Sequence, residues 1–394
     1  MSENKDVVIV SAKRTPIGSF QGVFSNLPAH KLGSLVIKSL IEETELEPSS
    51  VDEVIMGNVL SAGQGQAPAR QAALGSGLPN SVECLTINKM CGSGMKAVML
   101  ASQAIQAGDA EIIIAGGMEN MTKAPYLLPK ARSGYRLGNG EFIDSIIKDG
   151  LWDAYNDKHM GTCAEMHVSK NNFSREDLDS FAKISYERAI AAQNNNLFVK
   201  EIVPITIPYG KSDTQIIDAD EEPSRVNFEK IPLLKPVFDK NGAITAANAS
   251  KINDGAAALM LMTREKANSL GLKPLASITA QASAAHEPEW FTTAPLKVIS
   301  KVLKKANLSS NNIDLWEINE AFGTVVMAAI DEYELDHNKV NINGGAIALG
   351  HPIGCSGARI LTTLIHAMIK KDAHTGLATL CIGGGEASSI LVTR

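Results

Sequence analysis

The sequence predicts an α/β protein of two similar halves joined by a long irregular segment, and three observations carry this prediction. Short apolar runs of strand length alternate with amphipathic helical stretches, which favours a sheet covered by helices on both faces. The order of these elements near the N-terminus returns near the C-terminus. The chain has 394 residues, enough for two or three domains of roughly 100–200 residues each.

The first half is expected to alternate strands and helices up to a buried strand near residue 117. The elements in order are a strand at 7–10, a helix at 31–43, strands within 51–60 and 83–90 separated by a helix within 66–77, a helix within 92–110 and a strand at 111–117. Gly75, Gly77 and Gly108 are typical helix stops.

The second half repeats this plan, with strands within 275–285 and 313–322. The stretch 350–371 resembles 87–108, which aligns Ser356 with Ser93 and Arg359 with Lys96, and 377–387 parallels 111–121. Four matched elements in the same order indicate an internal duplication.

The segment at 121–249 differs from both halves, because it holds Pro-bounded pieces and one clear helix. That helix is expected to open at Ser174, with Asp177 as a second N-terminal signal. Loops held on a rigid scaffold are where substrate contacts tend to lie. We therefore interpret 121–249 as an insertion that lies over the core.

Composition excludes two classes of protein. The net charge is -6, from 37 basic and 43 acidic residues, so no basic surplus exists for a nucleic-acid backbone. The longest apolar runs fall well short of the ~18–20 residues that a membrane span needs. The chain begins with a polar stretch rather than a signal sequence, and five cysteines are an odd number, so we expect reduced thiols and a cytoplasmic location.

Cys91 stands where an expected strand ends and an expected helix begins, followed by Gly92-Ser93-Gly94. A thiol at a helix N-terminus lies at the positive end of the backbone dipole, which lowers its pKa. The glycines allow a substrate to approach closely and offer N–H groups to an oxyanion. A small buried cysteine in a tight turn is the alternative interpretation.

His351 precedes the helix that duplication pairs with the one after Cys91, so the two turns are expected to face each other as a nucleophile and its base. Cys381 ends a strand before three glycines and is expected at the same crevice. Asn319 ends another central strand, where its amide can orient a water or donate to a developing negative charge. The alternatives are a surface histidine, a core cysteine and a helix-capping asparagine.

Two other kinds of site are less consistent with these residues. A zinc site is disfavoured because the cysteines are isolated and no Cys-x-x-Cys or His-x-x-x-His spacing occurs, so no metal ligand is expected. The glycine runs lack the lysine or acidic partner of a nucleotide-binding loop.

Three stretches together resemble the signatures of the thiolase family. Residues 88–121, which contain Cys91, resemble its acyl-intermediate signature, 341–359 resemble its second signature and 381–392 resemble its C-terminal one. Shorter similar blocks cover the rest of the chain, at 14–22, 159–165, 248–257 and 318–322.

The resemblance implies a thiolase fold, in which two duplicated βαβαβαββ-type halves pack as a five-layered α-β-α-β-α core with a loop domain. We expect an N-terminal half at 1–120 with 250–271 returning to it, a loop domain at 121–249 for substrate binding and oligomerisation, and a C-terminal half at 272–394.

The resemblance also implies an acyltransferase that reversibly condenses two acetyl-CoA to acetoacetyl-CoA and CoA. Cys91 would carry the acetyl group as a thioester, with His351 accepting the thiol proton, and Cys381 would deprotonate the methyl of the second acetyl-CoA. His351 and a water on Asn319 would hold the enolate oxygen. The backbone N–H groups of Cys91 and Gly383 would hold the tetrahedral oxyanion.

The family's substrate contacts map onto six positions: Leu151, His159, Met160, Ser250, Ala321 and Phe322. The chain departs from the family at Phe291, where a Met-Gly-x-Gly-Pro run is usual, and a bulky ring there is expected either to narrow the acyl tunnel or to move the pantetheine.

CoA thioesters are the expected partners, with no separable cofactor, no nucleic acid and no membrane. The segment 127–138 resembles a tetramerisation segment, so a homotetramer is expected. Two other functions stay open: a 3-ketoacyl-CoA thiolase of broader chain length, and a non-catalytic CoA- or lipid-binding protein of the same fold. A ketoacyl synthase would use a Cys and two His, whereas the third group here is Cys381.

Overall fold

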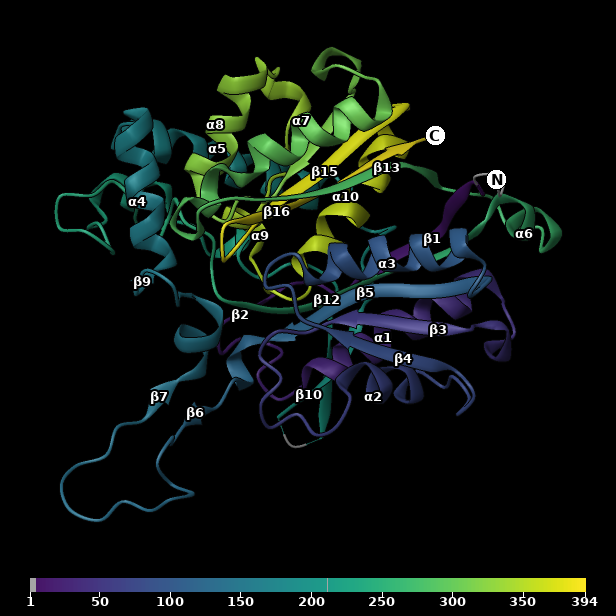
Figure 1. Ribbon diagram of the computed structural model, residues 1–394, viewed down its shortest axis with the longest axis horizontal. Coiled ribbons are helices and arrows are strands. Elements are labelled where there is room, and N and C mark those ends of the chain that lie inside the picture. Colours follow the sequence, from purple (N-terminus) through teal and green to yellow (C-terminus); the bar gives the residue numbers. More distant parts are fainter. Residues whose placement is uncertain (1–4, 211) are drawn as a thin grey trace.

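The computed structural model describes residues 5–210 and 212–394, so the first four residues of the expected N-terminal half and residue 211 of the loop segment lie outside it. A 10-stranded sheet runs through the molecule in the order β14-β15-β16-β13-β1-β12-β5-β3-β4, with β2 beside β12. Among the described strands, its two halves are joined at β1 and β13, through the pairs Val8–Ser277 and Ile9–Ala276. This narrow junction lets the halves face each other (Figure 1).

The N-terminal half contains a mixed sheet in which β3 is parallel to β4 and β5, whereas β12 is antiparallel to β5 and β1. Its strands are β1 (Val7–Arg14), β2 (Gly18–Ser19), β3 (Glu53–Gly57), β4 (Glu83–Ile87), β5 (Ile112–Asn120) and β12 (Asn253–Thr263). Its helices are α1 (Ala29–Thr44), α2 (Pro68–Gly75), α3 (Ser93–Ala107) and α6 (Arg264–Ser269). Because β12 lies between β1 and β5, the chain returns to this half after the insertion.

The C-terminal half repeats the arrangement, with β14 parallel to β15 and the other neighbours antiparallel. Its strands are β13 (Ala276–Ala285), β14 (Leu315–Ile318), β15 (Thr375–Ile382) and β16 (Glu386–Thr393). Its helices are α7 (Ala294–Ala306), α8 (Gly323–Tyr333), α9 (Ala346–Leu349) and α10 (Ser356–Lys371).

Helices α3 and α10 form the middle of five layers, which are stacked in Figure 1 from α1 and α2 at the bottom to α7 and α8 at the top. Both are buried in one apolar core with side chains from both half-sheets. The two helices cross at Gly94 and Gly357, where a Cβ on either glycine would collide with the backbone of the opposite helix. Their N-termini, and the turns before them, are therefore held together at the centre of the molecule.

The insertion packs on both halves rather than forming a core of its own. Its helices and strands are β6 (Tyr126–Leu127), β7 (Ile143–Asp144), β8 (Trp152–Asp153), β9 (Lys158–His159), α4 (Met160–Asn171), α5 (Arg175–Asn194), β10 (Ile205–Tyr209) and β11 (Asp213–Ile217). Ser174 and Asp177 form a reciprocal capping box at the start of α5, as predicted. The buried Arg14 on β1 pairs with Glu201 and Asp220, which anchors the insertion to the N-terminal half.

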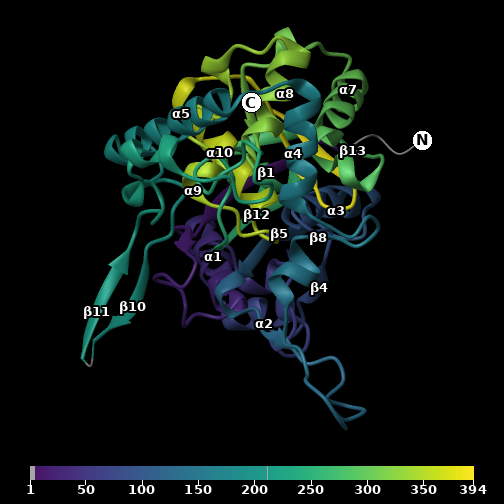
Figure 2. The same ribbon diagram turned by 90° about the vertical axis from the view of Figure 1, so that its left-hand side faces the viewer.

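Two hairpins, β6–β7 and β10–β11, project from the body (Figures 1 and 2).

Short helical turns complete the structure: η1 (Pro48–Ser50), η2 (Met121–Lys123), η3 (Ile146–Gly150), η4 (Pro223–Arg225), η5 (Phe228–Leu233), η6 (Pro288–Thr293), η7 (Ser310–Asn312) and η8 (His337–Lys339). Among the described residues, none of the helices combines the length and apolar character needed to cross a bilayer.

Candidate active site

A cavity of about 230 Å³ lies where the turns before α3 and α10 meet the insertion. Cys91, His351 and Gly383 line it, together with the six positions expected to contact substrate, Leu151, His159, Met160, Ser250, Ala321 and Phe322. Phe291 lines it as well. Folding thus brings residues from stretches that are far apart in the chain around one pocket.

Cys91 is held on a sharp turn between β4 and α3. Met90 before it has φ of 47°, a left-handed conformation. The Ser93 hydroxyl fixes the turn, because its oxygen accepts from the Lys89 N–H at 2.8 Å and its hydrogen goes to the Met90 carbonyl at 2.7 Å. A Cβ on Gly92 would collide with Ile382, so this glycine lets the turn lie against the end of β15.

The Cys91 thiol is protonated at rest, contrary to the lowered pKa expected from its place before a helix. Burial raises its pKa to about 11, and the Glu119 carboxylate also disfavours the thiolate. Two hydrogen bonds to the sulfur, from the backbone N–H groups of Gly383 and of Cys91 itself, lower the pKa but do not offset burial. Desolvation by the residues packed around Cys91 therefore raises its pKa more than the helix N-terminus lowers it. Attack by this thiol would need a base to take its proton.

His351 supplies a neutral imidazole with a defined tautomer. Its Nδ1 lies 2.6 Å from the Ser356 hydroxyl oxygen, and that hydroxyl donates its only hydrogen to the Pro352 carbonyl at 2.9 Å. With the hydroxyl hydrogen assigned to Pro352, Nδ1 carries the ring hydrogen and Nε2 is the lone-pair nitrogen. Within the described residues Nε2 has no hydrogen-bond partner. Burial, and then the charge of Arg359, lowers the His351 pKa to about 3, so the ring is a neutral acceptor.

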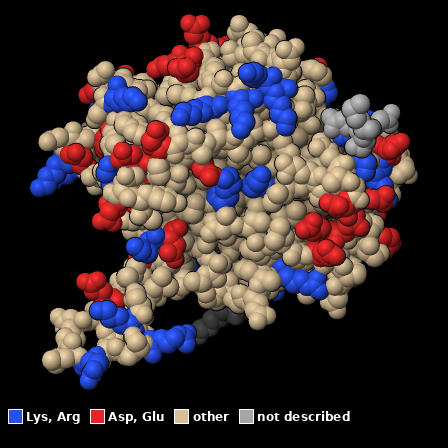
Figure 3. Space-filling view, in the orientation of Figure 1, with Lys and Arg blue, Asp and Glu red and all other residues tan. Residues whose placement is uncertain are grey.

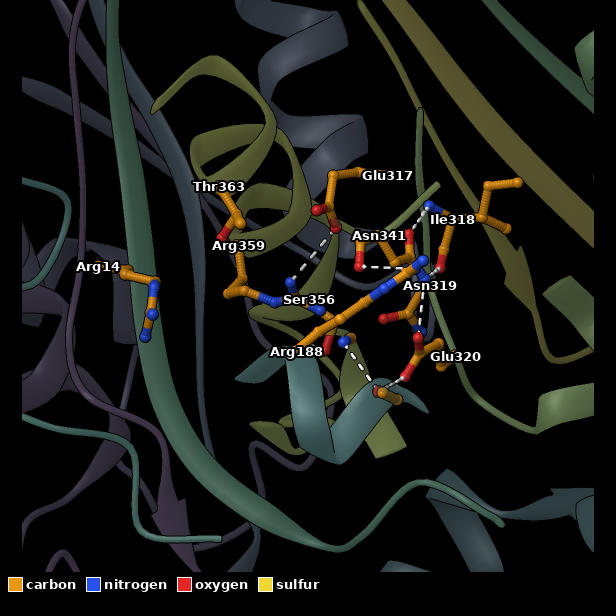
Figure 4. A network of polar contacts seen from close by, with 12 residues as sticks. Arg14, Arg188, Glu317, Ile318, Asn319, Glu320, Asn341, Ser356, Arg359 and Thr363 are labelled. Carbon is orange, nitrogen blue, oxygen red and sulfur yellow. Dashed lines mark hydrogen bonds and ion pairs between the residues drawn. The ribbon is translucent and has the colours of Figure 1, made fainter. Parts of the chain in front are cut away.

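Asn319 follows β14 and lies beside this imidazole, with its Nδ2 3.5 Å from Nδ1 of His351. Since Nδ1 of His351 already donates to Ser356, the ring needs no hydrogen bond from the Asn319 amide. The Oδ1 atom of Asn319 has no partner among the described residues. Neighbouring Glu320 accepts from Ser185 and Asn341, which holds this end of β14 in place (Figure 4). The fully buried Asn319 lies behind the cavity wall rather than in it.

Cys381 is the penultimate residue of β15 and is fully buried. It packs in an apolar cluster with Met160, Phe291 and Phe322, the side chains at one end of the cavity. Burial first, and then the charge of Cys91, raises its pKa well above the ordinary thiol value. A second thiol therefore lies next to the first, although Cys381 does not reach the cavity surface as the described side chains are placed.

Aromatic rings pack against one another beside Phe291 in the lining of the cavity. The His159 ring accepts from the Gly161 N–H at 3.0 Å and stacks on Phe238 with centroids 4.9 Å apart. Phe322 meets Phe238 and Phe291 edge to face, at 6.2 and 6.3 Å between centroids. This packing favours a short acyl group.

Ser356 and Glu119 help to build the site, and neither has an assignment from the sequence. Ser356 fixes the tautomer of His351. The sequence comparison aligns it with Ser93 only as a shared small residue. Glu119 accepts from the backbone N–H groups of Val59, Leu60 and Gly354 at 3.0, 3.2 and 2.9 Å. It ties β3 to the turn after His351, and its signal in the sequence is an acidic residue that ends an apolar strand.

The described residues contain no group of three or more His, Cys, Asp or Glu arranged to hold a metal ion. What the site contains is a thiol beside a neutral imidazole, a second buried thiol and two backbone N–H groups that converge on the first sulfur. Such a set, on a duplicated five-layered α/β fold, is typical of an acyltransferase.

The chain belongs to the thiolase family and has the thiolase fold. Family models described as "Thiolase, N-terminal domain" and "Thiolase, C-terminal domain" match residues 7–265 and 272–394. An acetyl-CoA acetyltransferase of Schizosaccharomyces pombe is 50% identical over 392 residues, covering 99% of both chains. The acetyl-CoA acetyltransferase of Pseudomonas aeruginosa is 51% identical over 391 residues, with 99% of this chain and 100% of the relative covered.

The fold also matches a solved structure, the Acat5 thiolase from Ascaris suum in complex with coenzyme A. The TM-score is 0.94 with 45% sequence identity, over 99% of this chain and 100% of the other.

Proposed function

We propose that this chain is an acetyl-CoA C-acetyltransferase, which condenses two acetyl-CoA to acetoacetyl-CoA and CoA and also catalyses the reverse thiolysis. One observation carries the proposal: Cys91, the free Nε2 of His351 and the Gly383 amide meet at a small cavity with an aromatic end. The similarity to acetyl-CoA acetyltransferases over the full length supports it.

In the first half-reaction, Nε2 of His351 takes the proton of the Cys91 thiol as the sulfur attacks the thioester carbonyl. The N–H groups of Cys91 and Gly383, which already face the sulfur, stabilise the tetrahedral oxyanion, and such a donor contributes ~2.7–4 kcal/mol in the transition state. Cys381 gives its proton to the departing CoA thiolate. The enzyme is left as an acetyl-Cys91 thioester with a thiolate and an imidazolium.

In the second half-reaction, the Cys381 thiolate removes a proton from the methyl group of another acetyl-CoA. Its raised pKa makes it a strong base for a weakly acidic C–H. His351, aided by a water on Asn319, holds the enolate oxygen. The carbanion attacks the acetyl carbon, the Cys91 sulfur leaves and takes the His351 proton, and all three groups return to their starting protonation states.

We further propose that no separable cofactor takes part, since CoA carries the acyl group in both half-reactions. The partners are then acetyl-CoA, acetoacetyl-CoA and CoA. A cytoplasmic location is proposed because all five cysteines, which lie within the described residues, are free thiols.

A homotetramer, built as a dimer of dimers, is proposed from the β6–β7 hairpin. The hairpin stands away from the body, and Leu137 and Phe142 on it are exposed by 101% and 74%. Blue Lys and Arg side chains gather on it at the lower left of Figure 3. A long exposed loop with apolar side chains is typical of a surface that another copy covers.

A 3-ketoacyl-CoA thiolase of broad chain length is the main competing function, and Phe291 argues against it. The test is a chain-length profile in the thiolysis direction. We expect faster turnover of acetoacetyl-CoA than of C8 or C16 ketoacyl-CoA, and faster turnover of the long chains would contradict the proposal. A protein without activity would instead leave Cys91 unacetylated after incubation with acetyl-CoA.

A further inference from the structure

The segment that forms one wall of the cavity contacts the His351 turn at two points. Ser250, Lys251 and Ile252 line the cavity. Just beyond them, Asn253 accepts from the His351 backbone N–H at 3.1 Å. The Lys251 ammonium donates to the carbonyl of Ile347 at 3.0 Å, and Ile347 lies on α9, which ends two residues before His351.

The Lys251 ammonium lies among oxygen atoms from three separate elements. Besides the Ile347 carbonyl, it contacts the hydroxyl of Tyr186 on α5, and a carboxylate oxygen of Glu222 lies 3.9 Å away. Tyr186 is 2% exposed and the Glu222 side chain 10%. These oxygen atoms have little contact with water, so the ammonium supplies the hydrogen bonds that water would otherwise make to them.

Helix α9 needs a donor at this point. It is a single turn of four residues, and the last carbonyls of any helix have no partner within the helix. The backbone N–H groups of Leu349 and Gly350 bond to Gly345 and Ala346, so neither satisfies the Ile347 carbonyl. A lysine near a helix C-terminus both satisfies such a carbonyl and suits the negative end of the dipole.

We propose that Lys251 is a positioning residue of the acyl-transfer site, whose ammonium fixes the end of α9 and thereby the direction in which His351 presents Nε2 to Cys91. This inference rests on the proposed function for its role in turnover. The N–H side of Ile347 is held independently, because it donates to Glu320 at 3.1 Å. Loss of the ammonium therefore loosens the end nearest His351 while the helix stays attached.

The test measures alkylation of Cys91 by iodoacetamide, with each cysteine followed by peptide mass spectrometry. Attack by Cys91 needs His351 as the base but no thioester, so the rate reports His351 alignment without relying on the substrate. Cys84 lies on β4 and is half-buried, and its rate is the internal reference. The variants are Lys251→Ala, which removes the ammonium and leaves space, and Lys251→Met, which keeps the bulk without the charge.

We expect both variants to alkylate Cys91 about tenfold more slowly, the effect of losing a charged hydrogen bond, while Cys84 reacts at the wild-type rate. Propylammonium, the part of the side chain that Lys251→Ala removes, should restore most of the Cys91 rate in that variant. It should not do so in Lys251→Met, where the space is filled. Tetramethylammonium at the same ionic strength has no N–H group and should restore neither.

An unchanged Cys91 rate in both variants would overturn the inference, even if their KM for CoA rose, since Lys251 would then act on the substrate directly. Equal recovery with tetramethylammonium would overturn it as well. If the wild-type chain did not turn over acetoacetyl-CoA but the alkylation pattern held, the proposed function would fail while the positioning role stood.

Discussion

The Ser356 hydroxyl lies 2.6 Å from Nδ1 of His351 and gives its own hydrogen to the Pro352 carbonyl. Since the hydroxyl is then only an acceptor toward the ring, the imidazole is locked with Nδ1 protonated and Nε2 free. The equivalent serine of the first half, Ser93, also donates to a backbone carbonyl of its own turn, that of Met90 at 2.7 Å. The duplicated turns thus use the same type of side chain for two tasks, one to shape the Cys91 turn and one to orient the His351 ring.

Replacing Ser356 with alanine should slow the reaction without weakening substrate binding. The variant loses one buried hydrogen bond and the tautomer preference, which we expect to lower kcat about tenfold while KM changes little. Steady-state thiolysis of acetoacetyl-CoA measures both constants. Ser356→Thr keeps the hydroxyl and should retain most of the rate, whereas an equal loss in Ser356→Thr would show that packing, not the hydroxyl, matters.

The pH dependence of Cys91 alkylation should show that Cys91 and His351 do not form an ion pair at rest. The pKa of Cys91 is raised to about 11 and that of His351 is lowered to about 3, so between these values both groups are neutral. At neutral pH His351 assists the attack of the thiol, and at higher pH the free thiolate adds to it, so the rate of Cys91 alkylation should climb from its neutral-pH value up to pH 10 and level off only near 11. A plateau already reached near pH 6 would indicate a thiolate–imidazolium pair at rest and contradict this reading of the site.

Shortening Phe291 should widen the range of acyl chains. Phe291→Ala removes a ring from the lining of the cavity, and a pocket that gains room for one or two methylenes shifts selectivity about tenfold or more. The ratio of kcat/KM for 3-ketohexanoyl-CoA to that for acetoacetyl-CoA measures this shift. Phe291→Met, which keeps most of the volume, is the control, and an unchanged ratio in Phe291→Ala would remove the residue from chain-length selection.

The β6–β7 hairpin should govern assembly rather than chemistry. Leu137→Ser with Phe142→Ser removes its most exposed apolar side chains. Light scattering after size-exclusion chromatography should then show dimers where the wild type gives tetramers, with acetylation of Cys91 preserved. A double variant that stays tetrameric would place the contact elsewhere.

The approach of the two reactive turns follows from the sequence because it is a property of the duplication. Equivalent strand–turn–helix units pack about a common centre, where Gly94 and Gly357 let α3 and α10 touch. Cys91 and His351 precede these helices, so matching the halves is enough to bring them together. The position of the insertion cannot be predicted in this way, because single long-range contacts hold it in place. One of them joins Arg14 to Asp220, 206 residues apart.

Burial explains the rest of what local patterns could not predict. The lowered pKa expected for Cys91 follows from the helix after it, which the local sequence predicts. The raised pKa follows from burial by residues that are distant in the sequence. Lys251 and Ile347 are 96 residues apart, and nothing in the sequence near either one predicts the bond between them.

The most direct test of the account is mass spectrometry of Cys91 after incubation with acetyl-CoA, applied to wild type, Cys91→Ala and Cys381→Ala, with acetoacetyl-CoA formation followed in parallel. We predict an acetyl adduct in wild type and Cys381→Ala, none in Cys91→Ala, and condensation in wild type alone. Condensation at the wild-type rate in Cys381→Ala, or acetylation elsewhere than Cys91, would contradict the division of labour between the two thiols.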